Sequence, residues 1–334
     1  MKKLYIILFF LAALTVNGTT WTVDSNLARP ADFRNLQDAN DSENVSTGDV
    51  LHVMPSTQGY GTLNLSKGLA IIGPGYLLNV NPNLNFNVAA PSARMGNLTV
   101  SPGADGALIT GMEIAGNVVF AASNFLYANN VTLKRNYIQG RINSGTGAHG
   151  GDIRLLQNYI TSYVSFSGTS NSGLLVRGNY IGSYVFMNHS DDSGIFAHNV
   201  VDAASGSSFS GSMLVENNLV RLGLSTSDSA VARHNWTSSS VSGNFRWDAE
   251  AEPPVAFADQ FVGGNPVDTR WQLKADAAVR ETGFGGVDPG MFAGPDPYVL
   301  SGLPSVPMVI GVQAPSSASA ASGLPITVDV QVNP

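Results

Sequence analysis

Acidic and histidine side chains suited to acid/base or cation chemistry gather in one group of loops in the middle of this chain. The candidates for catalysis are Asp152, His189, Asp191, Asp192 and Asp228, and His149 lies in the same group. Acid/base cleavage of a glycosidic bond needs two carboxylates that flank it, and calcium needs six or more oxygen ligands. The same residue types are common in solvated turns, and this plainer interpretation is preferred.

Two rows of tyrosines form a second candidate site. One row consists of Tyr137, Tyr159 and Tyr180, and the other of Tyr163 and Tyr184, which follow Arg141 at the equivalent position. Both rows are expected to point outward. Sugar rings stack on aromatic faces, so the rows could bind an extended polysaccharide as substrate or ligand. The alternative is that the tyrosines stack on one another and stabilise neighbouring strands.

Both candidate sites belong to an internal repeat, which must position them. Near copies of an Asn-Tyr-Ile motif recur along the chain. The repeat asparagines are Asn136, Asn158, Asn179, Asn199, Asn218 and Asn235. Their spacing falls from 22 residues at the first step (136 to 158) to 17 at the last (218 to 235). A repeat of this length is typical of a solenoid in which each repeat forms one coil.

Apolar and polar residues alternate around each asparagine. Next to Asn158, for example, Leu155 and Ile160 fall on one face of the predicted strands. The asparagine is expected to mark the bend between two strands, because Asn tolerates a left-handed backbone. Stacked coil on coil, the side-chain amides are expected to form a hydrogen-bonded ladder.

Proline placement also favours stacked strands. All 17 prolines lie at or before Pro102 or at or after Pro253, and a proline between them would remove an N–H from the ladder. The predicted fold is all-β: a right-handed parallel β-helix over residues 19–247, with an N-terminal capping helix between Pro30 and Asn44. Residues 248–334 are rich in Pro and Gly, and we expect an irregular C-terminal cap that ends in a terminal β-extension.

The N-terminus predicts export. Lys2 and Lys3 precede an apolar run from Leu4 to Val16, so residues 1–18 are interpreted as a signal peptide. The run is too short to span a bilayer comfortably. The rest of the chain is expected to be secreted, periplasmic or on the cell surface, with no integral membrane segment.

The composition limits the chemistry further. Charged residues make up 12% of the chain, against about 25% in a typical soluble protein, and the net charge is −7. No cluster of Lys and Arg is present, so nucleic acid is a poor partner. The chain has no Cys, which excludes disulfides and thiol catalysis. No cofactor is evident, and calcium remains an open alternative that no ligand set in the sequence supports.

The run from Phe33 to Gly75 contains Leu-Gln-Asp-Ala, then Thr-Gly-Asp-Val-Leu-His-Val, then Lys-Gly-Leu-Ala-Ile-Ile-Gly-Pro-Gly. This pattern resembles the opening of secreted pectate-lyase-like right-handed β-helix proteins. The resemblance implies the fold but leaves the chemistry open, because that superfamily includes lyases, hydrolases, epimerases, tailspikes and adhesins. Its lyases use acidic residues that bind calcium with an Arg or Lys base, and its hydrolases use clustered Asp residues.

The sequence therefore predicts an exported protein that binds, and could also process, extracellular polysaccharide or cell-surface glycan along one face of the solenoid. Only eight acidic residues lie between residues 96 and 246, and no sugar-lyase motif is present, so the balance is against an enzyme. If the chain is an enzyme, it is a polysaccharide lyase or a glycoside hydrolase. The alternative is a non-catalytic adhesin or scaffold protein of a surface or matrix.

Overall fold

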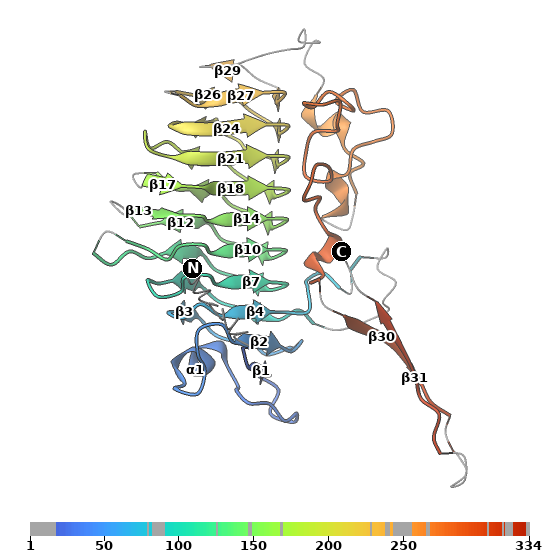
Figure 1. Ribbon diagram of the computed structural model, residues 1–334. Helices are drawn as coiled ribbons and strands as arrows, with labels where there is room; N and C mark the ends of the chain where they lie inside the picture. Colours follow the sequence, from blue (N-terminus) through green and yellow to red (C-terminus); the bar gives the residue numbers. More distant parts are fainter. Residues whose placement is uncertain are drawn as a thin grey trace, which may run out of the picture.

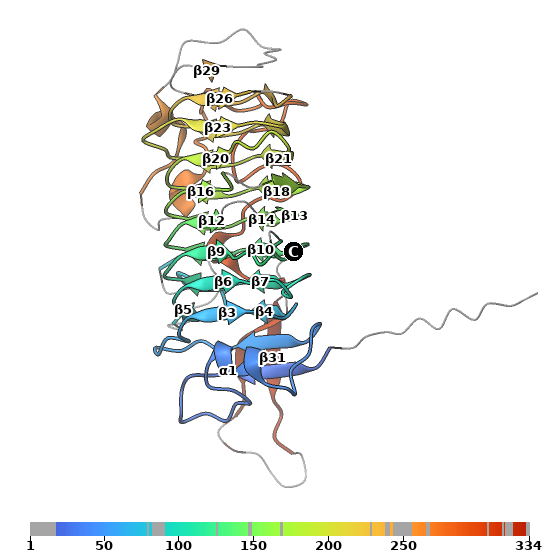
Figure 2. The same cartoon turned by 90° about the vertical axis from the view of Figure 1, so that its left-hand side faces the viewer.

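A computed structural model describes residues 18–78, 80–81, 91–124, 126–145, 149–167, 170–227, 229–237, 241–242, 256–264, 268–305, 307–315, 317 and 323–331. The first part of the chain forms a parallel β-solenoid whose three long sheets run the length of a rod (Figure 1 and Figure 2). Eight turns contribute one strand to every sheet. The prediction of an all-β parallel β-helix is confirmed at this level.

We call the three long sheets A, B and C. Sheet A consists of β1 (Thr20–Val23), β2 (Val50–Val53), β4 (Ala70–Ile72), β7 (Leu108–Thr110), β10 (Thr132–Lys134), β14 (Arg154–Leu156), β18 (Leu174–Arg177), β21 (Ser193–Ala197), β24 (Ser212–Glu216) and β27 (Val231–Arg233). Sheet B consists of β3 (Leu63–Leu65), β6 (Leu98–Val100), β9 (Val118–Phe120), β12 (Ile142–Ser144), β16 (Val164–Ser165), β20 (Val185–Met187), β23 (Ser207–Phe209), β26 (Leu224–Thr226) and β29 (Val241–Ser242).

Sheet C consists of β5 (Arg94–Met95), β8 (Glu113–Ile114), β11 (Tyr137–Ile138), β15 (Tyr159–Ile160), β19 (Tyr180–Ile181), β22 (Val200–Val201), β25 (Leu219–Val220) and β28 (Trp236–Thr237). A short parallel pair is formed by β13 (His149–Gly151) and β17 (Ser170–Ser172). All neighbours within the three long sheets pair in parallel, one coil apart. The inward side chains therefore stack in columns along the axis.

The core of the rod consists mainly of aliphatic side chains, with a few buried aromatic rings such as Phe120 and Phe196. In sheet C, Ile138, Ile160 and Ile181 lie in register on adjacent strands and are fully buried. The alternation read from the sequence predicts this, because successive side chains of a strand point to opposite faces. Apolar burial contributes about 25 cal/mol per Å², so each coil is stabilised mainly by stacking on its two neighbours.

The six repeat asparagines form the predicted ladder. The main-chain N and the side-chain Nδ2 of each asparagine donate to Oδ1 of the next, at 2.8–3.1 Å, from Asn136 to Asn235. Each Nδ2 also donates to a main-chain oxygen of sheet A, as that of Asn158 does to Leu133. The six residues are at most 2% exposed, and this pairing satisfies amides that would otherwise be buried at a cost.

The left-handed residue of each bend precedes the ladder asparagine. The residues at this position have φ between 51° and 66°, and they are Arg135, Gln157, Gly178, His198, Asn217 and His234. The expectation that the ladder asparagine itself takes the left-handed conformation is therefore wrong. The asparagine amide binds along the ladder, and the residue before it makes the turn. Such a conformation costs a non-glycine residue of the order of 1 kcal/mol, which the surrounding contacts must offset.

Helix α1 (Leu36–Asp41) lies where the sequence predicts a helix, and it packs against β3 at the edge of sheet B. The side-chain oxygens of Gln37 and Asn40 accept hydrogen bonds from the main-chain N–H groups of Asn64 and Ser66, at 2.7 and 3.0 Å. The helix therefore satisfies donors at the end of a sheet, where no further strand of sheet B pairs.

The C-terminal segment, by which we mean described residues 256–264 and 268–305, lies along the outer face of sheet C (Figure 1). It contains three 3₁₀ helices, η1 (Phe257–Gln260), η2 (Thr269–Trp271) and η3 (Leu300–Gly302). Its apolar cluster with the solenoid extends from Tyr76, in an early turn, to Trp236, in the last. The segment thus covers one side of the rod along most of its length.

The chain then forms an antiparallel hairpin of β30 (Met308–Gln313) and β31 (Thr327–Gln331). The hairpin projects past the N-terminal end of the rod (Figure 1). A strand is therefore present where the sequence predicts the terminal β-extension.

Candidate functional site

The first tyrosine row lies on the outer face of sheet C and is covered by the C-terminal segment. Tyr159 and Tyr180 are 3% and 7% exposed, and Tyr137 is half-buried. The ring of Trp271 stacks on Tyr180 at a centroid distance of 4.7 Å, and Trp271 Nε1 donates to Tyr159 Oη at 3.3 Å. The expectation that this row is open to a sugar is therefore corrected, because side chains from the C-terminal segment occupy its surface.

Burial also determines the acid–base state of this row. It raises the pKa of Tyr159 to about 12. Burial raises the pKa of Tyr180 as well, and the nearby Tyr159 and Asp202 act in the same direction. Both phenols are neutral at physiological pH and cannot act as bases there. Their rings and hydroxyls hold the C-terminal segment against sheet C.

The second tyrosine row is partly exposed. Tyr163 and Tyr184 precede β16 and β20 at the border between sheets C and B, and their rings stack at 4.7 Å with an interplanar angle of 12°. Arg141, one coil earlier, donates from Nη1 to Tyr163 Oη at 3.0 Å. Phe186, on the outward side of β20, lies 4.6 Å from Tyr184. We call these four residues the aromatic group of sheet B.

The two coils after Tyr184 carry no side chain at the equivalent position. The parallel register places Gly206, and then Gly223, after Tyr184 along the axis. A Cβ added at Gly206 would find only Gly223 backbone atoms within 4 Å. The backbone at Gly206 therefore borders a space without side chains, next to the Phe186 ring that packs on Tyr184, and we call this space the glycine shelf.

The remainder of the outer face of sheet B is polar and almost uncharged. Its central column contains, coil by coil, Asn64, Thr99, Val119, Asn143, Ser165, Phe186, Ser208 and Ser225. In Figure 2 this sheet faces the viewer with no other part of the drawn ribbon across it. Hydroxyls and amides beside stacked aromatic rings are suited to a polyhydroxylated, neutral ligand.

Among the acidic candidates, Asp192 is a buried structural acceptor, 1% exposed. Its Oδ1 accepts from the main-chain N and from Nδ2 of Asn171, at 3.0 and 3.1 Å, and its Oδ2 accepts from the main-chain N of His189 at 3.1 Å. Burial raises the pKa of Asp192. Because its oxygens are engaged inside the protein, Asp192 serves as a rung between two coils and has no open approach for a substrate.

The other candidates lie on loops and strands around this rung. Asp191 is exposed, and its carboxylate lies 3.8 Å from His189 Nδ1. Asp152 is exposed at a left-handed bend, with its main-chain N–H bound to Ser172 O. His149 is exposed on β13. Asp228 lies outside the described residues. Among the described members of this group, hydrogen bonds and a close charged contact join only His189, Asp191 and Asp192.

In the described part of the chain, no group of three or more His, Asp or Glu side chains is arranged to hold a metal ion. Calcium stays an expectation that depends on the resemblance alone.

Phe186 and the glycine shelf are the parts of this site that the sequence argument missed. Phe186 belongs to the outward column of β20, and its aromatic type at an outward strand position is the signal that could have found it. The shelf has a weaker signal, because Gly206 and Gly223 become neighbours only when the coils are aligned in register.

By its fold the chain is a parallel β-solenoid with one face covered by its own C-terminal segment and another that carries a partly exposed aromatic group. Comparisons with protein-family models, curated proteins and solved structures find no match. Over the described residues, the helices are too short or too polar to cross a membrane.

Proposed function

We propose that this chain is an exported β-helix protein that binds extracellular polysaccharide or cell-surface glycan along the outer face of sheet B. The observation that carries the proposal is the stacked pair of Tyr163 and Tyr184, which is partly exposed on a sheet that the C-terminal segment leaves uncovered. Apolar faces of sugar rings pack well on such rings. A flat, regular face accommodates an extended ligand better than a deep pocket does.

The glycine shelf is the subsite we propose for one sugar ring. A sugar ring above Gly206 would lie in the layer that follows Tyr184 along the axis. The Phe186 ring, which packs on Tyr184, would contact the sugar, and Ser208 lies in the adjacent column of hydroxyls. Coil spacing in a parallel solenoid is about 4.8 Å, close to the separation of stacked rings, so the stack and the coils keep the same step.

Binding is proposed without catalysis. Asp192 is engaged as a buried rung, and Asp191 stands exposed beside His189. A glycosidase needs two carboxylates placed on either side of one bond, and the aromatic group of sheet B contains none. Lyase or hydrolase activity therefore has no support from this face.

Glycan-array binding of the purified chain, followed by calorimetry on the hits, tests the proposal. We expect Tyr184→Ala to abolish measurable binding and Gly206→Leu, which fills the shelf but keeps every aromatic ring, to weaken it at least tenfold. Tyr184→Phe keeps the stacking surface and should bind normally. Arg154→Ala removes an exposed side chain from sheet A and serves as the control. Unchanged binding in both Tyr184→Ala and Gly206→Leu would overturn the proposal.

A second candidate function is a non-catalytic surface or matrix adhesin or scaffold. The hairpin favours it, because Leu324, Ile326, Val328 and Val330 lie on one side of β31 and its approach and are each about half exposed. Exposed apolar rows of this kind mark protein contact surfaces. Concentration-dependent association of the chain that Val328→Asp abolishes, together with no glycan hits, would favour this function over glycan binding.

We also infer three finer points of architecture and fate. The coil is right-handed, as in the resembling proteins. Helix α1 acts as the N-terminal cap, which its hydrogen bonds to β3 support. Residues 1–18 direct export, and fusing them to a reporter should move it out of the cytoplasm. An irregular C-terminal cap stays a prediction, because residues 243–255, which follow the last solenoid strand β29, lie outside the described residues.

A further inference from the structure

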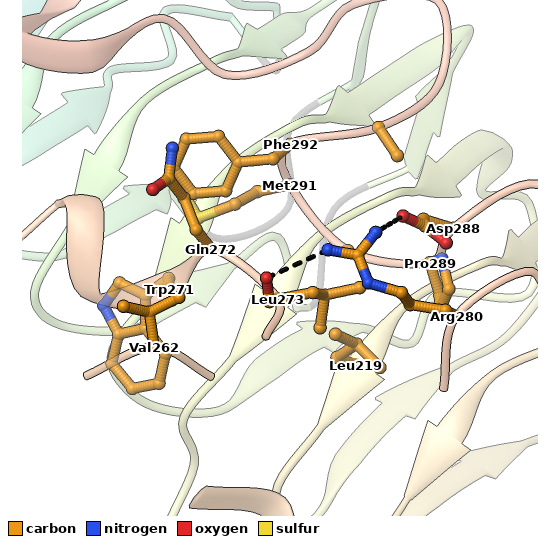
Figure 3. Close-up of a pocket in the computed structure, with 12 residues that line it drawn as sticks. Leu219, Val262, Trp271, Gln272, Leu273, Arg280, Asp288, Pro289, Met291 and Phe292 are labelled. Atoms are coloured by element: carbon orange, nitrogen blue, oxygen red, sulfur yellow. Dashed lines mark hydrogen bonds and ion pairs between the residues drawn. The ribbon is translucent and has the colours of Figure 1, made fainter. Parts of the chain in front are cut away.

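A cavity of about 280 Å³ lies between the C-terminal segment and the outer face of sheet C (Figure 3). Leu219 contributes from sheet C, and the remaining lining comes from the C-terminal segment. The lining is aromatic and aliphatic on one side, with Met291 and Phe292, and polar on the other, with Arg280 and Asp288. Sites for drug-sized ligands run from about 300 to 1,000 Å³, so this cavity fits a molecule of one ring.

The polar side of the cavity is held in place before any ligand arrives. Arg280 donates from Nε to Lys274 O at 2.7 Å and from Nη2 to Leu273 O at 3.0 Å. Its Nη1 donates to Asp288 Oδ2 at 2.6 Å, and Asp288 Oδ1 accepts from the main-chain N of Glu281 at 2.8 Å. These contacts use three of the five guanidinium N–H groups. Two N–H groups of Arg280 therefore remain to donate to a ligand, and the carboxylate of Asp288 beside them has lone pairs that can accept.

Charge and hydrogen bonding together indicate the ligand class. Arg280 and Asp288 are the charged residues of the lining and carry opposite charges, so the lining has no net charge. Gln272 also lines the cavity, and its side-chain amide makes no hydrogen bond to any residue that the structure describes. Adjacent donors and acceptors opposite an apolar ring match the vicinal hydroxyls and the C–H face of a sugar.

We propose that this cavity binds a single neutral sugar ring, either a free monosaccharide or the terminal residue of a glycan. In this arrangement the sugar packs on Phe292, and its hydroxyls bind the Arg280–Asp288 pair and the Gln272 amide. The cavity lies on the sheet C side of the rod, so the inference stands independently of the glycan-binding face proposed on sheet B.

Calorimetry with the full chain tests the inference. The probes are glucose, galactose, mannose and N-acetylglucosamine, with a trisaccharide that ends in the best of them, and indole as an apolar control. We expect saturable binding of at least one sugar with a Kd in the millimolar range. Gln272→Leu keeps the side-chain size and removes one hydrogen-bonding group, which should weaken binding about tenfold. Because that amide has no described partner, the variant should fold normally.

A matched variant separates the two sites. Tyr184→Ala should leave binding in the cavity unchanged, whereas Gln272→Leu should leave binding on sheet B unchanged. If the free sugar and the trisaccharide bind with equal affinity, the cavity accepts both a monosaccharide and the end of a glycan. If only one of the two binds, that one is the ligand of the cavity. No saturable sugar binding up to about 50 mM, well above the millimolar range, overturns the inference. Binding of indole alone, or sugar binding unaffected by Gln272→Leu and by Phe292→Ala, overturns it as well.

Discussion

Nδ2 of Asn158 donates to Oδ1 of Asn179 at 3.1 Å, and both side chains are fully buried. This contact is one step of a ladder that joins consecutive coils over the repeat. Each rung is both a donor and an acceptor, so removing one rung affects both the coil before it and the coil after it. The ladder therefore links the local bend of each coil to the stability of the whole rod.

Removing a central rung should destabilise the rod strongly. In Asn179→Ala, the main-chain N and Nδ2 of Asn158 lose their acceptor, and Leu155 O loses a donor. Each buried unsatisfied group costs about 1–3 kcal/mol, so the free energy of unfolding should fall by about 3 kcal/mol or more, as measured by urea denaturation. Asn188→Ala, at an exposed position outside the ladder, should change it by less than about 0.5 kcal/mol. Equal effects of the two substitutions would contradict a structural ladder.

The C-terminal segment should depend on one indole ring. Trp271→Ala removes the ring that stacks on Tyr180 and the donor to Tyr159. Loss of a buried aromatic side chain costs about 3–5 kcal/mol. We expect proteolysis to cut the C-terminal segment of the variant while the solenoid, which has its own core, stays intact. A variant as resistant as the parent would show that other contacts hold the segment.

The same variant should change a phenol titration. Burial raises the pKa of Tyr159 to about 12 in the folded protein, above its ordinary value near 10. A raised folded pKa means that the contribution to stability is complete below about pH 10 and is lost as the pH rises through about 12. In Trp271→Ala the phenol should titrate closer to about pH 10, which phenolate absorbance can follow. A titration unchanged from the parent would indicate that Tyr159 stays buried.

His198 should make the contact with the C-terminal segment sensitive to acid. Asn217 Oδ1 accepts from the main-chain N of Phe284 at 2.7 Å, which turns Asn217 Nδ2 toward His198 Nε2 at 3.0 Å. The ring nitrogen that faces this N–H must accept, so the imidazole is neutral. Burial lowers the pKa of His198, and Arg177 adds to this, while Glu216 opposes it.

A lowered folded pKa gives stability that is complete above the unfolded value of about 6.5 and is lost as the pH falls toward the folded value. The loss is at most about 1.4 kcal/mol per pH unit. We expect the difference in unfolding free energy between about pH 7.5 and pH 5 to be smaller in His198→Gln than in the parent. Carboxylates elsewhere titrate equally in both proteins, so the comparison isolates His198. An identical pH dependence in the two proteins would contradict this role.

A methyl group should not be tolerated at Gly178. This residue occupies the left-handed position before Asn179 with φ 66°, and a Cβ there would lie 2.3 Å from Asp296 O. Gly178→Ala therefore meets both backbone strain and a collision with the C-terminal segment, and it should lower the thermal midpoint by several degrees. Gly206→Ala, where the nearest atom would lie 3.4 Å away, is the matched control and should have little effect.

Most of the fold could be predicted from local properties of the sequence. The regular spacing of the asparagines, the apolar alternation around them and the lack of proline between Pro102 and Pro253 are local properties. Strand geometry converts them directly into stacked coils, because side chains alternate with a period of two and each coil needs a full set of ladder donors. The buried ladder from Asn136 to Asn235 follows from that spacing.

Local periodicity could not place the left-handed turn. It identified the bend but assigned the left-handed conformation to the asparagine, whereas the structure gives it to the residue before, such as Gln157. Side-chain types at that position range from Gly to His and Arg, so residue preference carries little signal. The amide of the asparagine is needed in the ladder, and this requirement appears only when neighbouring coils are stacked.

The sequence by itself determined which side chains point outward, and only the tertiary structure decided which of them remain accessible. Tyr180 and Tyr184 are both outward by periodicity. Trp271, 91 residues further along the chain than Tyr180, covers the first, while the second stays partly exposed because the coil after it carries Gly206 and no distant segment among the described residues packs on it. The physical reason is that strand alternation is a local property of the backbone, whereas burial of an outer face depends on a segment distant in sequence that must find apolar surface to pack against.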